Sequence, residues 1–308
     1  MPAAGYAFDA FPSGGIPREA SFDALRAVVT GVRAPAAVGR IIDRRRPNVV
    51  LGGGGYVGGP AVVAAARRRI PAALTEADAH LGLANRLAAP FATRVFLSYP
   101  IPGRDGGKYR VVGRPIPRRS LAADRDPRSA RSRFGLPVEG PVVLVCGGSL
   151  GSRRLNEAAI GAWADDGPAV LHLSGERDHP SLAPRVRRAT YRLLPYTDDF
   201  GEALAAADLV VSRAGGVVWE IAAAGRPALL VPYPYATADH QTKNARWFAG
   251  GGGALLVPEP ELDLGRQAGA LLSDPAGLGA MGRAMARLAR PDAARVVADE
   301  LVALGRSR

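Results

Sequence analysis

The fold of this chain is constrained most strongly by its short apolar runs. Each run ends in a glycine or polar turn, and a helical pattern follows. Between Asp208 and Ala245, DLVVS and RPALLVP read as buried strands, and VVWEIAAAG reads as a helix closed by Gly225. The same alternation runs through PNVVLG, PAALTE and TRVFLSYP early in the chain, and through PVVLVCG, AVLHLSG and YRLLPY later. Strands that alternate with helices predict parallel sheets covered by helices on both faces.

The stretch from Arg114 to Gly140 separates these two alternations, because it is rich in Arg, Pro, Asp and Ser and has no long apolar period. We therefore predict an α/β fold of two Rossmann-like parallel-sheet domains, residues 1–113 and 114–290, that face a cleft. From Leu262 onward, the apolar residues recur at the spacing of a helix. Pro291 predicts a break before a last helix, 291–308, which we expect to pack back on the N-terminal domain.

The chain is basic, with a net charge of +12 that comes from arginine, since Lys108 and Lys243 are the only lysines. Such a surface attracts anionic lipids, phosphates or nucleic acid. Cys146 is the only cysteine, so no intramolecular disulfide forms and a reducing compartment is expected. The uncharged run 49–66 contains Pro60 and six glycines, which argue against a membrane span. We expect a soluble or peripheral protein without a signal peptide.

A basic segment, 22–46, carries three arginines at a spacing of seven residues: Arg26, Arg33 and Arg40. Together with the apolar residues beside them, they form the pattern of a segment that lies in a membrane interface. The alternative is a pair of core-packed helices whose arginines point into water. Because Pro35 interrupts the segment, we do not expect one continuous helix.

Two glycine turns in the second half are suited to an anion. The strand PVVLVC, the turn 147–151 and a helix that begins near Arg153 present free N–H groups to a phosphate, with Gly148 and the Ser149 hydroxyl in the turn. A helix that starts after Gly216 does the same.

Within that second turn, Gly215 and Gly216 give the backbone room, and Glu220, one helical turn further on, is placed to accept hydrogen bonds from ribose hydroxyls. Arg114 and Arg118 are candidates for further phosphate contacts, because positive charge stabilises a leaving phosphate. The residues thus predict a pocket for a sugar nucleotide in the second domain.

Several motifs, in this order, resemble the MurG family, glycosyltransferases that move N-acetylglucosamine from UDP onto a lipid-linked muramyl-peptide. Besides Asp208 to Ala245, they are GGGGYVGGP, TEADAHLGLANR, VVGRPIP, GGSLGSRRLNEA and PYTDDF. The resemblance implies a GT-B glycosyltransferase fold. It also implies that Thr197 lies near uracil, Glu220 on ribose, and Gln241 and Asn244 near the sugar. Carboxamides suit sugar hydroxyls because they donate and accept hydrogen bonds.

The resemblance further implies an inverting reaction without metal or cofactor. The donor is UDP-N-acetylglucosamine, and the acceptor is a polyprenyl-pyrophosphate-linked muramyl-pentapeptide, so that lipid I becomes lipid II in peptidoglycan synthesis, which serves cell-wall formation, cell shape and division. We expect the protein at the cytoplasmic face of the plasma membrane, bound peripherally to its anionic surface and not to nucleic acid.

The chain departs from the family pattern in its first half. The family opens with a glycine-rich loop that ends in a histidine, and nothing similar precedes Tyr6, so we expect an incomplete N-terminal domain. Where the family reads His-Glu-Gln-Asn, this chain has the block 75–78, in which only Glu76 remains. Glu76 and Asp78 are then the candidates for the catalytic base.

Three alternatives remain open at this point. The first alternative is a glycosyltransferase that acts on another lipid acceptor, such as a diacylglycerol. The second is a truncated homologue whose catalysis is impaired. From a different class, an NAD(P)-binding oxidoreductase is favoured by Gly53, Gly55 and Gly58, whose spacing fits a dinucleotide-binding turn, with Glu76 as the ribose-binding acid.

Overall fold

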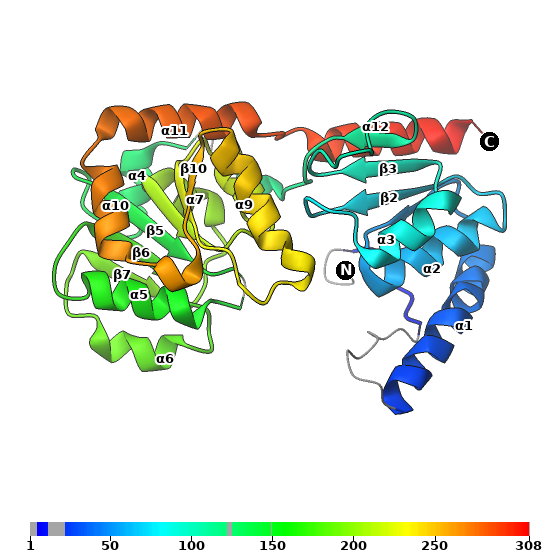
Figure 1. The fold of residues 1–308 in the computed structure, drawn as a ribbon, viewed down its shortest axis with the longest axis horizontal. Helices are drawn as coiled ribbons and strands as arrows, with labels where there is room; N and C mark the ends of the chain where they lie inside the picture. Colours follow the sequence, from blue (N-terminus) through cyan, green and yellow to red (C-terminus); the bar gives the residue numbers. More distant parts are fainter. Residues whose placement is uncertain (1–4, 12–21, 122–124, 149, 308) are drawn as a thin grey trace. The chain divides into compact units, whose positions relative to one another are not determined.

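The computed structural model describes residues 5–11, 22–121, 125–148 and 150–307, without the side chains of 22–33 and 56 (Figure 1). The chain divides into two compact units. The first comprises residues 1–112 and 294–308, and the second comprises residues 113–293.

Among the described residues of the first unit, four parallel strands form a sheet in chain order: β1 (Val50–Gly52), β2 (Ala72–Glu76), β3 (Arg94–Leu97) and β4 (Tyr109–Val111). The sequence predicted the first three. The accompanying helices are α1 (Phe22–Arg45), α2 (Gly55–Ala66), α3 (Leu83–Ala88), the 3₁₀ turn η2 (Ala89–Phe91) and α12 (Ala293–Arg306).

Side chains alternate across this sheet and so bury both of its faces. Leu74 and Val95 pack in one apolar cluster with residues of α2, whereas Ala73 and Phe96 pack in another with Val297 of α12. Figure 1 shows α12 running along the sheet of this unit. The C-terminal helix is therefore part of the core of the first unit.

An ion-pair cluster also joins α12 to the sheet of the first unit. Glu300 of α12 lies 3.2 Å from the Nε of Arg94 and 2.6 Å from the Nη1 of Arg110, on the neighbouring strands β3 and β4. One carboxylate thus bridges two strands at the point where the helix crosses them.

The expected break in the segment 22–46 is wrong, because α1 is one helix that continues through Pro35. Its residues Ala34, Val38 and Ile42 follow each other at helical spacing and are buried. The burial of this stripe stabilises the helix against the hydrogen bond that Pro35 removes. Arg40 is exposed, while the side chains of Arg26 and Arg33 lie outside the described residues.

The sheet of the second unit has the strand order β10-β9-β8-β5-β6-β7, and every described pairing in it is parallel. The strands are β5 (Val142–Cys146), β6 (Ala169–Leu173), β7 (Tyr191–Leu194), β8 (Leu209–Ser212), β9 (Ala228–Leu230) and β10 (Ala254–Leu256). After β5 the chain adds strands in one direction, and from β8 it adds them in the other. The strand order therefore reverses between β5 and β8.

Helices and 3₁₀ turns connect these strands and cover the sheet. They are η3 (Arg118–Ser120), α4 (Pro127–Arg133), α5 (Arg153–Trp163), α6 (His179–Leu182), η4 (Ala183–Arg185), α7 (Phe200–Ala206), α8 (Val218–Ala223), η5 (Thr237–Asp239), α9 (His240–Gly250), η6 (Glu259–Glu261), α10 (Leu264–Leu272) and α11 (Pro275–Leu288). The chain breaks between α11 and α12 near Pro291, as the sequence predicted.

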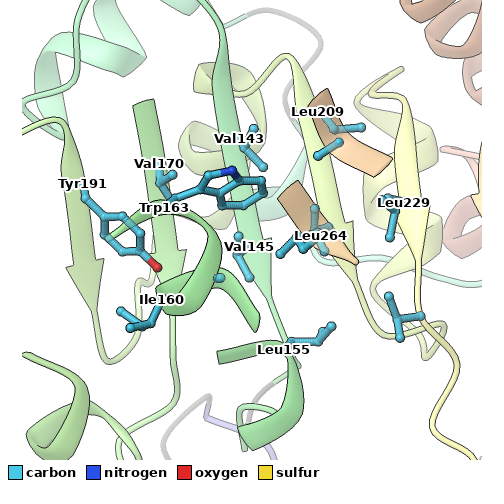
Figure 2. Close-up of a cluster of buried hydrophobic side chains, with 14 of the residues drawn as sticks. Val143, Val145, Leu155, Ile160, Trp163, Val170, Tyr191, Leu209, Leu229 and Leu264 are labelled. Carbon is cyan, nitrogen blue, oxygen red and sulfur yellow. The ribbon is translucent and has the colours of Figure 1, made fainter. Parts of the chain in front are cut away.

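The core of the second unit lies between the sheet and its helices. Figure 2 shows Val143 and Val145 of β5 among side chains from α5 and the adjacent strands. Leu155 of α5 is fully buried there, and Trp163 closes the cluster at the other end of the helix. This packing fixes where α5 starts relative to the end of β5.

No helix in the described part of the chain is both long enough and apolar enough to cross a membrane.

Candidate functional site

A cavity of about 1040 Å³ opens at the carboxyl edge of the second sheet, within the second unit. Its walls come from the segments that follow β5, β6, β7, β8, β9 and β10, and from residues 114–120. This is the place where the strand order reverses, and open parallel sheets bind their ligands at such a point. Of the predicted site residues, Arg114, Gly148, Thr197, Gly215, Gly216, Glu220 and Gln241 line the cavity.

The first glycine turn brings the start of α5 to the cavity. Gly151 has a φ of +73°, and a Cβ there would lie 2.1 Å from the carbonyl oxygen of Ser174, so only glycine fits. The side chain of Ser152, which precedes α5, does not cap the helix, and the first-turn N–H groups have no partner within the helix. Gly148 lines the cavity, and Ser149 lies outside the described residues.

A buried polar network fixes this turn against the end of β6. The Asn156 carboxamide donates to the Ser174 carbonyl at 2.9 Å and to the Asp178 carboxylate at 3.0 Å. Its oxygen therefore accepts from the Nε2 of His172 at 2.9 Å, and the Tyr191 hydroxyl donates to Nδ1 at 2.8 Å. Burial lowers the pKa of His172 to about 3, so the ring is neutral and serves the framework.

Arg213, which follows β8, joins four segments around the cavity. Its Nε donates to the Ser152 hydroxyl at 3.0 Å, and its Nη1 donates to the carbonyls of Val231 and Pro232, each at 3.1 Å. Its Nη2 pairs with Glu259. Sequence analysis missed this residue, because its partners are distant in sequence and no local pattern marks it.

The second glycine turn lies under an arginine. The Arg114 guanidinium packs on Gly216 so closely that a Cβ there would lie 2.5 Å from its central carbon. Glu220 follows on the first turn of α8. Burial raises the pKa of this carboxyl group, while a hydrogen bond from Ser120 and the charges of Arg114 and Arg119 lower it.

The remaining predicted donor-site residues differ in their surroundings. Gln241 lines the cavity and accepts a hydrogen bond from the Tyr233 N–H at 2.9 Å. Thr197 lines it too, and its hydroxyl accepts from the Asp199 N–H at 3.1 Å. Asn244 is buried outside the lining and donates to the Ala214 carbonyl at 3.1 Å, so it fixes the turn after β8.

Arg118 also lies outside the cavity lining, although its neighbour Arg119 contributes to it. Further cations that sequence reasoning did not select line the wall: Arg153, Arg154 and Arg177. The half-exposed Tyr196 and Tyr233 add aromatic surface. The cavity thus combines positive charge, free helix N–H groups and rings, which suits a nucleoside diphosphate.

The thiol of Cys146 lies at this place but is not suited to act as a nucleophile. Cys146 lines the cavity, but burial raises the pKa of its thiol to about 12, which leaves it protonated. Across the described residues, no three His, Cys, Asp or Glu side chains gather as metal ligands.

In the first unit, Glu76 ends β2 and is buried. Its carboxylate accepts hydrogen bonds from the N–H groups of Asp78 at 3.3 Å and Gly82 at 2.9 Å, and from the Asn85 carboxamide at 2.9 Å. Glu76 therefore organises the loop 77–82. The Glu76 carboxylate, which a dinucleotide at the glycine turn after β1 would need for its ribose, thus already accepts three hydrogen bonds from the protein.

Two parallel α/β sheets, with a cation-lined cavity at a strand-order reversal, are typical of the class of proteins that bind a phosphorylated nucleotide. Comparison with known proteins specifies the class. Residues 142–297 match the C-terminal domain of glycosyltransferase family 28, and residues 1–97 match its N-terminal domain. The chain belongs to this family and, within it, to the MurG family that its motifs indicated.

The similar proteins cover nearly the whole chain. A UDP-N-acetylglucosamine–N-acetylmuramyl-(pentapeptide) pyrophosphoryl-undecaprenol N-acetylglucosamine transferase of Nocardioides sp. is 39% identical over 99% of this chain and 86% of its own length. Its counterpart from Rubrobacter xylanophilus is 38% identical over 99% and 91%. The crystal structure of Acinetobacter baumannii MurG is 27% identical, with a TM-score of 0.73 over 89% of this chain and 79% of that one. The predicted fold of two parallel-sheet α/β domains is confirmed.

Two glycines of the first turn provide a test of the tight contact beside α5. Both Gly148 and Gly151 have positive φ, so alanine at either position costs about 1–2 kcal/mol of backbone strain. Only Gly151 also touches a backbone oxygen; nothing lies within 4 Å of a Cβ at Gly148. Gly151→Ala should therefore lower the free energy of unfolding, measured in urea, more than Gly148→Ala. Equal losses of unfolding free energy in the two variants would contradict the close contact between Gly151 and the Ser174 carbonyl.

Proposed function

We propose that this protein transfers N-acetylglucosamine from UDP-N-acetylglucosamine to a polyprenyl-pyrophosphate-linked muramyl-pentapeptide, the step from lipid I to lipid II in peptidoglycan synthesis. The observation that carries the proposal is the cavity at the reversal point of the second sheet, in a chain of the MurG family. The reaction substitutes UDP at the anomeric carbon of the sugar with inversion. It needs a site for UDP, cations for the leaving diphosphate and a base for the acceptor hydroxyl.

The diphosphate is placed at the start of α5. The helix contributes its first-turn N–H groups and the positive end of its dipole, beside Gly148. As the bond to the sugar breaks, the negative charge on UDP increases, and the cation that packs on Gly216, Arg114, stabilises that charge. Arg114 thereby supplies positive charge at a turn where Val217 and Val218 offer no hydroxyl group. We assign no phosphate contact to Arg118, which lies outside the lining.

We assign the nucleoside and the sugar to different residues of the cavity lining. Glu220 accepts hydrogen bonds from the ribose hydroxyls, because a carboxylate with half-buried surroundings binds a diol through charge-assisted hydrogen bonds. The uracil ring lies beside Tyr196 and Thr197, where the exposed tyrosine ring offers an aromatic surface. Gln241 contacts the sugar, and Asn244 acts indirectly by holding the Ala214 carbonyl.

The acceptor side is assigned to the carboxyl edge of the first sheet. There, Glu76 orders the loop that carries Asp78, and we infer that Asp78 takes the proton from the acceptor hydroxyl while Glu76 keeps the loop in place. Of the two carboxylates that the sequence offered as the catalytic base, Asp78 thus acts on the acceptor and Glu76 on the loop.

A membrane contact for the first unit is supported by an exposed apolar stripe. Leu83, Leu87 and Phe91 follow each other at helical spacing along α3 and η2, and they are 62%, 67% and 51% exposed. Arg86 is exposed within the same segment. An apolar stripe with cations beside it is typical of a protein that lies on an anionic lipid surface. We infer peripheral binding at the cytoplasmic face, with the exposed Arg40 of α1 adding charge.

The donor site is tested by calorimetry with UDP-N-acetylglucosamine. Glu220→Ala should weaken binding about 10- to 100-fold, because it removes hydrogen bonds to a charged group, and Gln241→Ala should weaken it about 3- to 10-fold. Glu139→Ala, an exposed carboxylate of the same unit, is the matched control and should leave the affinity unchanged. Wild-type affinity in both Glu220→Ala and Gln241→Ala would contradict the assignment of these residues to the donor site. In a separate thermal-shift measurement, a rise in the melting temperature with NADH but not with UDP-N-acetylglucosamine would favour an oxidoreductase.

The base is tested by steady-state kinetics. Asp78→Asn should lower kcat about 100-fold or more, since general base catalysis contributes that much, with the affinity for UDP unchanged. Glu76→Gln, which keeps the shape of the side chain that orders the loop, should lower kcat less. A larger loss of kcat in Glu76→Gln than in Asp78→Asn would reverse the two roles.

The membrane contact is tested by co-sedimentation with vesicles of anionic lipids. The double variant Leu87→Ser, Phe91→Ser should reduce the bound fraction about tenfold, because it removes two apolar side chains from the interface. Tyr235→Ser, which changes an exposed ring of the second unit, is the control. Unchanged binding of the double variant would place the membrane contact elsewhere.

A further inference from the structure

A buried carboxylate pairs with two of the cations that line the cavity. Asp178, which follows β6, is 6% exposed and accepts hydrogen bonds from the Nε of Arg177 at 2.8 Å and from its Nη2 at 3.0 Å. The Nη2 of Arg153, the first residue of α5, lies 3.8 Å from the same carboxylate. Both arginines line the cavity, and Asp178 lies behind them, outside the lining. Arg177 and Asp178 also lie outside the family motifs.

The position of Asp178 is set by the buried network of the second unit. The Asn156 carboxamide donates to its Oδ2 at 3.0 Å, and that carboxamide is itself held by the Ser174 carbonyl and by His172. A buried carboxylate is costly to leave without partners, so Asp178 keeps the Arg177 guanidinium beside it. The framework thus fixes a cation whose side chain would otherwise move freely at the surface.

The geometry of the pair leaves Arg177 able to bind a second anion. The carboxylate takes one N–H group from Nε and one from Nη2, in the planar two-point arrangement that arginine forms with carboxylates. Within the described parts of the chain, the other N–H groups of this guanidinium have no partner, and the side chain is 60% exposed. A phosphate oxygen can therefore bind to these N–H groups while Asp178 stays in place.

Arg177 lies close to the place that we assign to the diphosphate. The loop after β6 packs on the glycine turn that leads into α5, because a Cβ on Gly175 would lie 2.8 Å from the Gly151 nitrogen. Arg153 begins that helix and shares the Asp178 carboxylate with Arg177. Cations and first-turn N–H groups therefore meet at the same end of the cavity.

We propose that Arg177 contacts a phosphate oxygen of the donor diphosphate and that Asp178 is the positioning residue that holds its guanidinium there. This inference rests on the proposed function, in which the diphosphate lies at the start of α5. A fixed guanidinium loses less conformational freedom on binding than a free arginine side chain does. Asp178 therefore raises the affinity for an anion, although it carries a negative charge itself.

The phosphate contact is tested by calorimetry on the full chain with two ligands, UDP and uridine, which lacks the diphosphate. The unaltered protein should bind UDP more tightly. Arg177→Ala should weaken UDP binding about tenfold, the scale of a lost hydrogen bond between charged groups, and should leave the affinity for uridine unchanged. Arg187→Ala is the matched control, because Arg187 is an exposed arginine that pairs with Asp165 outside the cavity lining.

The role of Asp178 is tested by a double-mutant cycle with the same ligands. With Arg177 present, Asp178→Asn should weaken UDP binding about 2- to 10-fold, because the ligand must then order the guanidinium itself. In the Arg177→Ala background the same change should cause no loss, since it then only removes a negative charge. A residue that merely supports the fold would give the same loss in both backgrounds, and the affinity for uridine would fall as well.

Different results contradict different parts of this inference. Equal affinity of the unaltered protein for UDP and uridine would overturn the diphosphate site of the proposed function, and the role of Arg177 with it. If UDP is preferred and Arg177→Ala leaves that preference intact, only the contact with Arg177 is wrong. An equal loss from Asp178→Asn in both backgrounds, or a gain in UDP affinity when Arg177 is present, would overturn the positioning role of Asp178.

Discussion

The candidate site of this protein depends on the reversal of strand order between β5 and β8 in the second sheet. Because the two strands are neighbours and parallel, their glycine turns and the helices that follow come together at one edge. Two helix starts and several arginines then face the same cavity, and their positive charge suits the diphosphate that we propose binds there. Asn156 and Arg213 hold the turns by hydrogen bonds, so the cavity is organised before a ligand arrives.

Much of this site could be predicted from the sequence, because its elements carry local patterns. The strand and turn that lead to Arg153, and the glycines before Glu220, are short-range signals that the structure reproduces. The strands β4 and β10 were missed, since each has only three residues and borders a glycine-rich stretch. The continuous α1 was missed for another reason: the burial of Val38 outweighs the local effect of Pro35.

The residues that no pattern marked are those whose partners lie far away along the chain. Arg213 pairs with Glu259, and Glu300 pairs with Arg94 and Arg110, across separations that local periodicity does not encode. Some predicted site residues line the cavity and others are buried in the framework, and the sequence did not distinguish the two cases. Gln241 lines the cavity, whereas Asn244, one turn later on the same helix, is buried and holds a main-chain carbonyl. The chemical type of a side chain suggests what it can do, and its neighbours decide whether it contacts the ligand or the framework.

The most direct test of the central claim is a crystal structure of the chain with UDP at saturating concentration. The account predicts the nucleotide in the cavity of the second unit, with phosphate oxygens about 3 Å from the N–H groups that begin α5 and the ribose hydroxyls on the Glu220 carboxylate. UDP bound elsewhere, or a cavity that stays empty at that concentration, would contradict it.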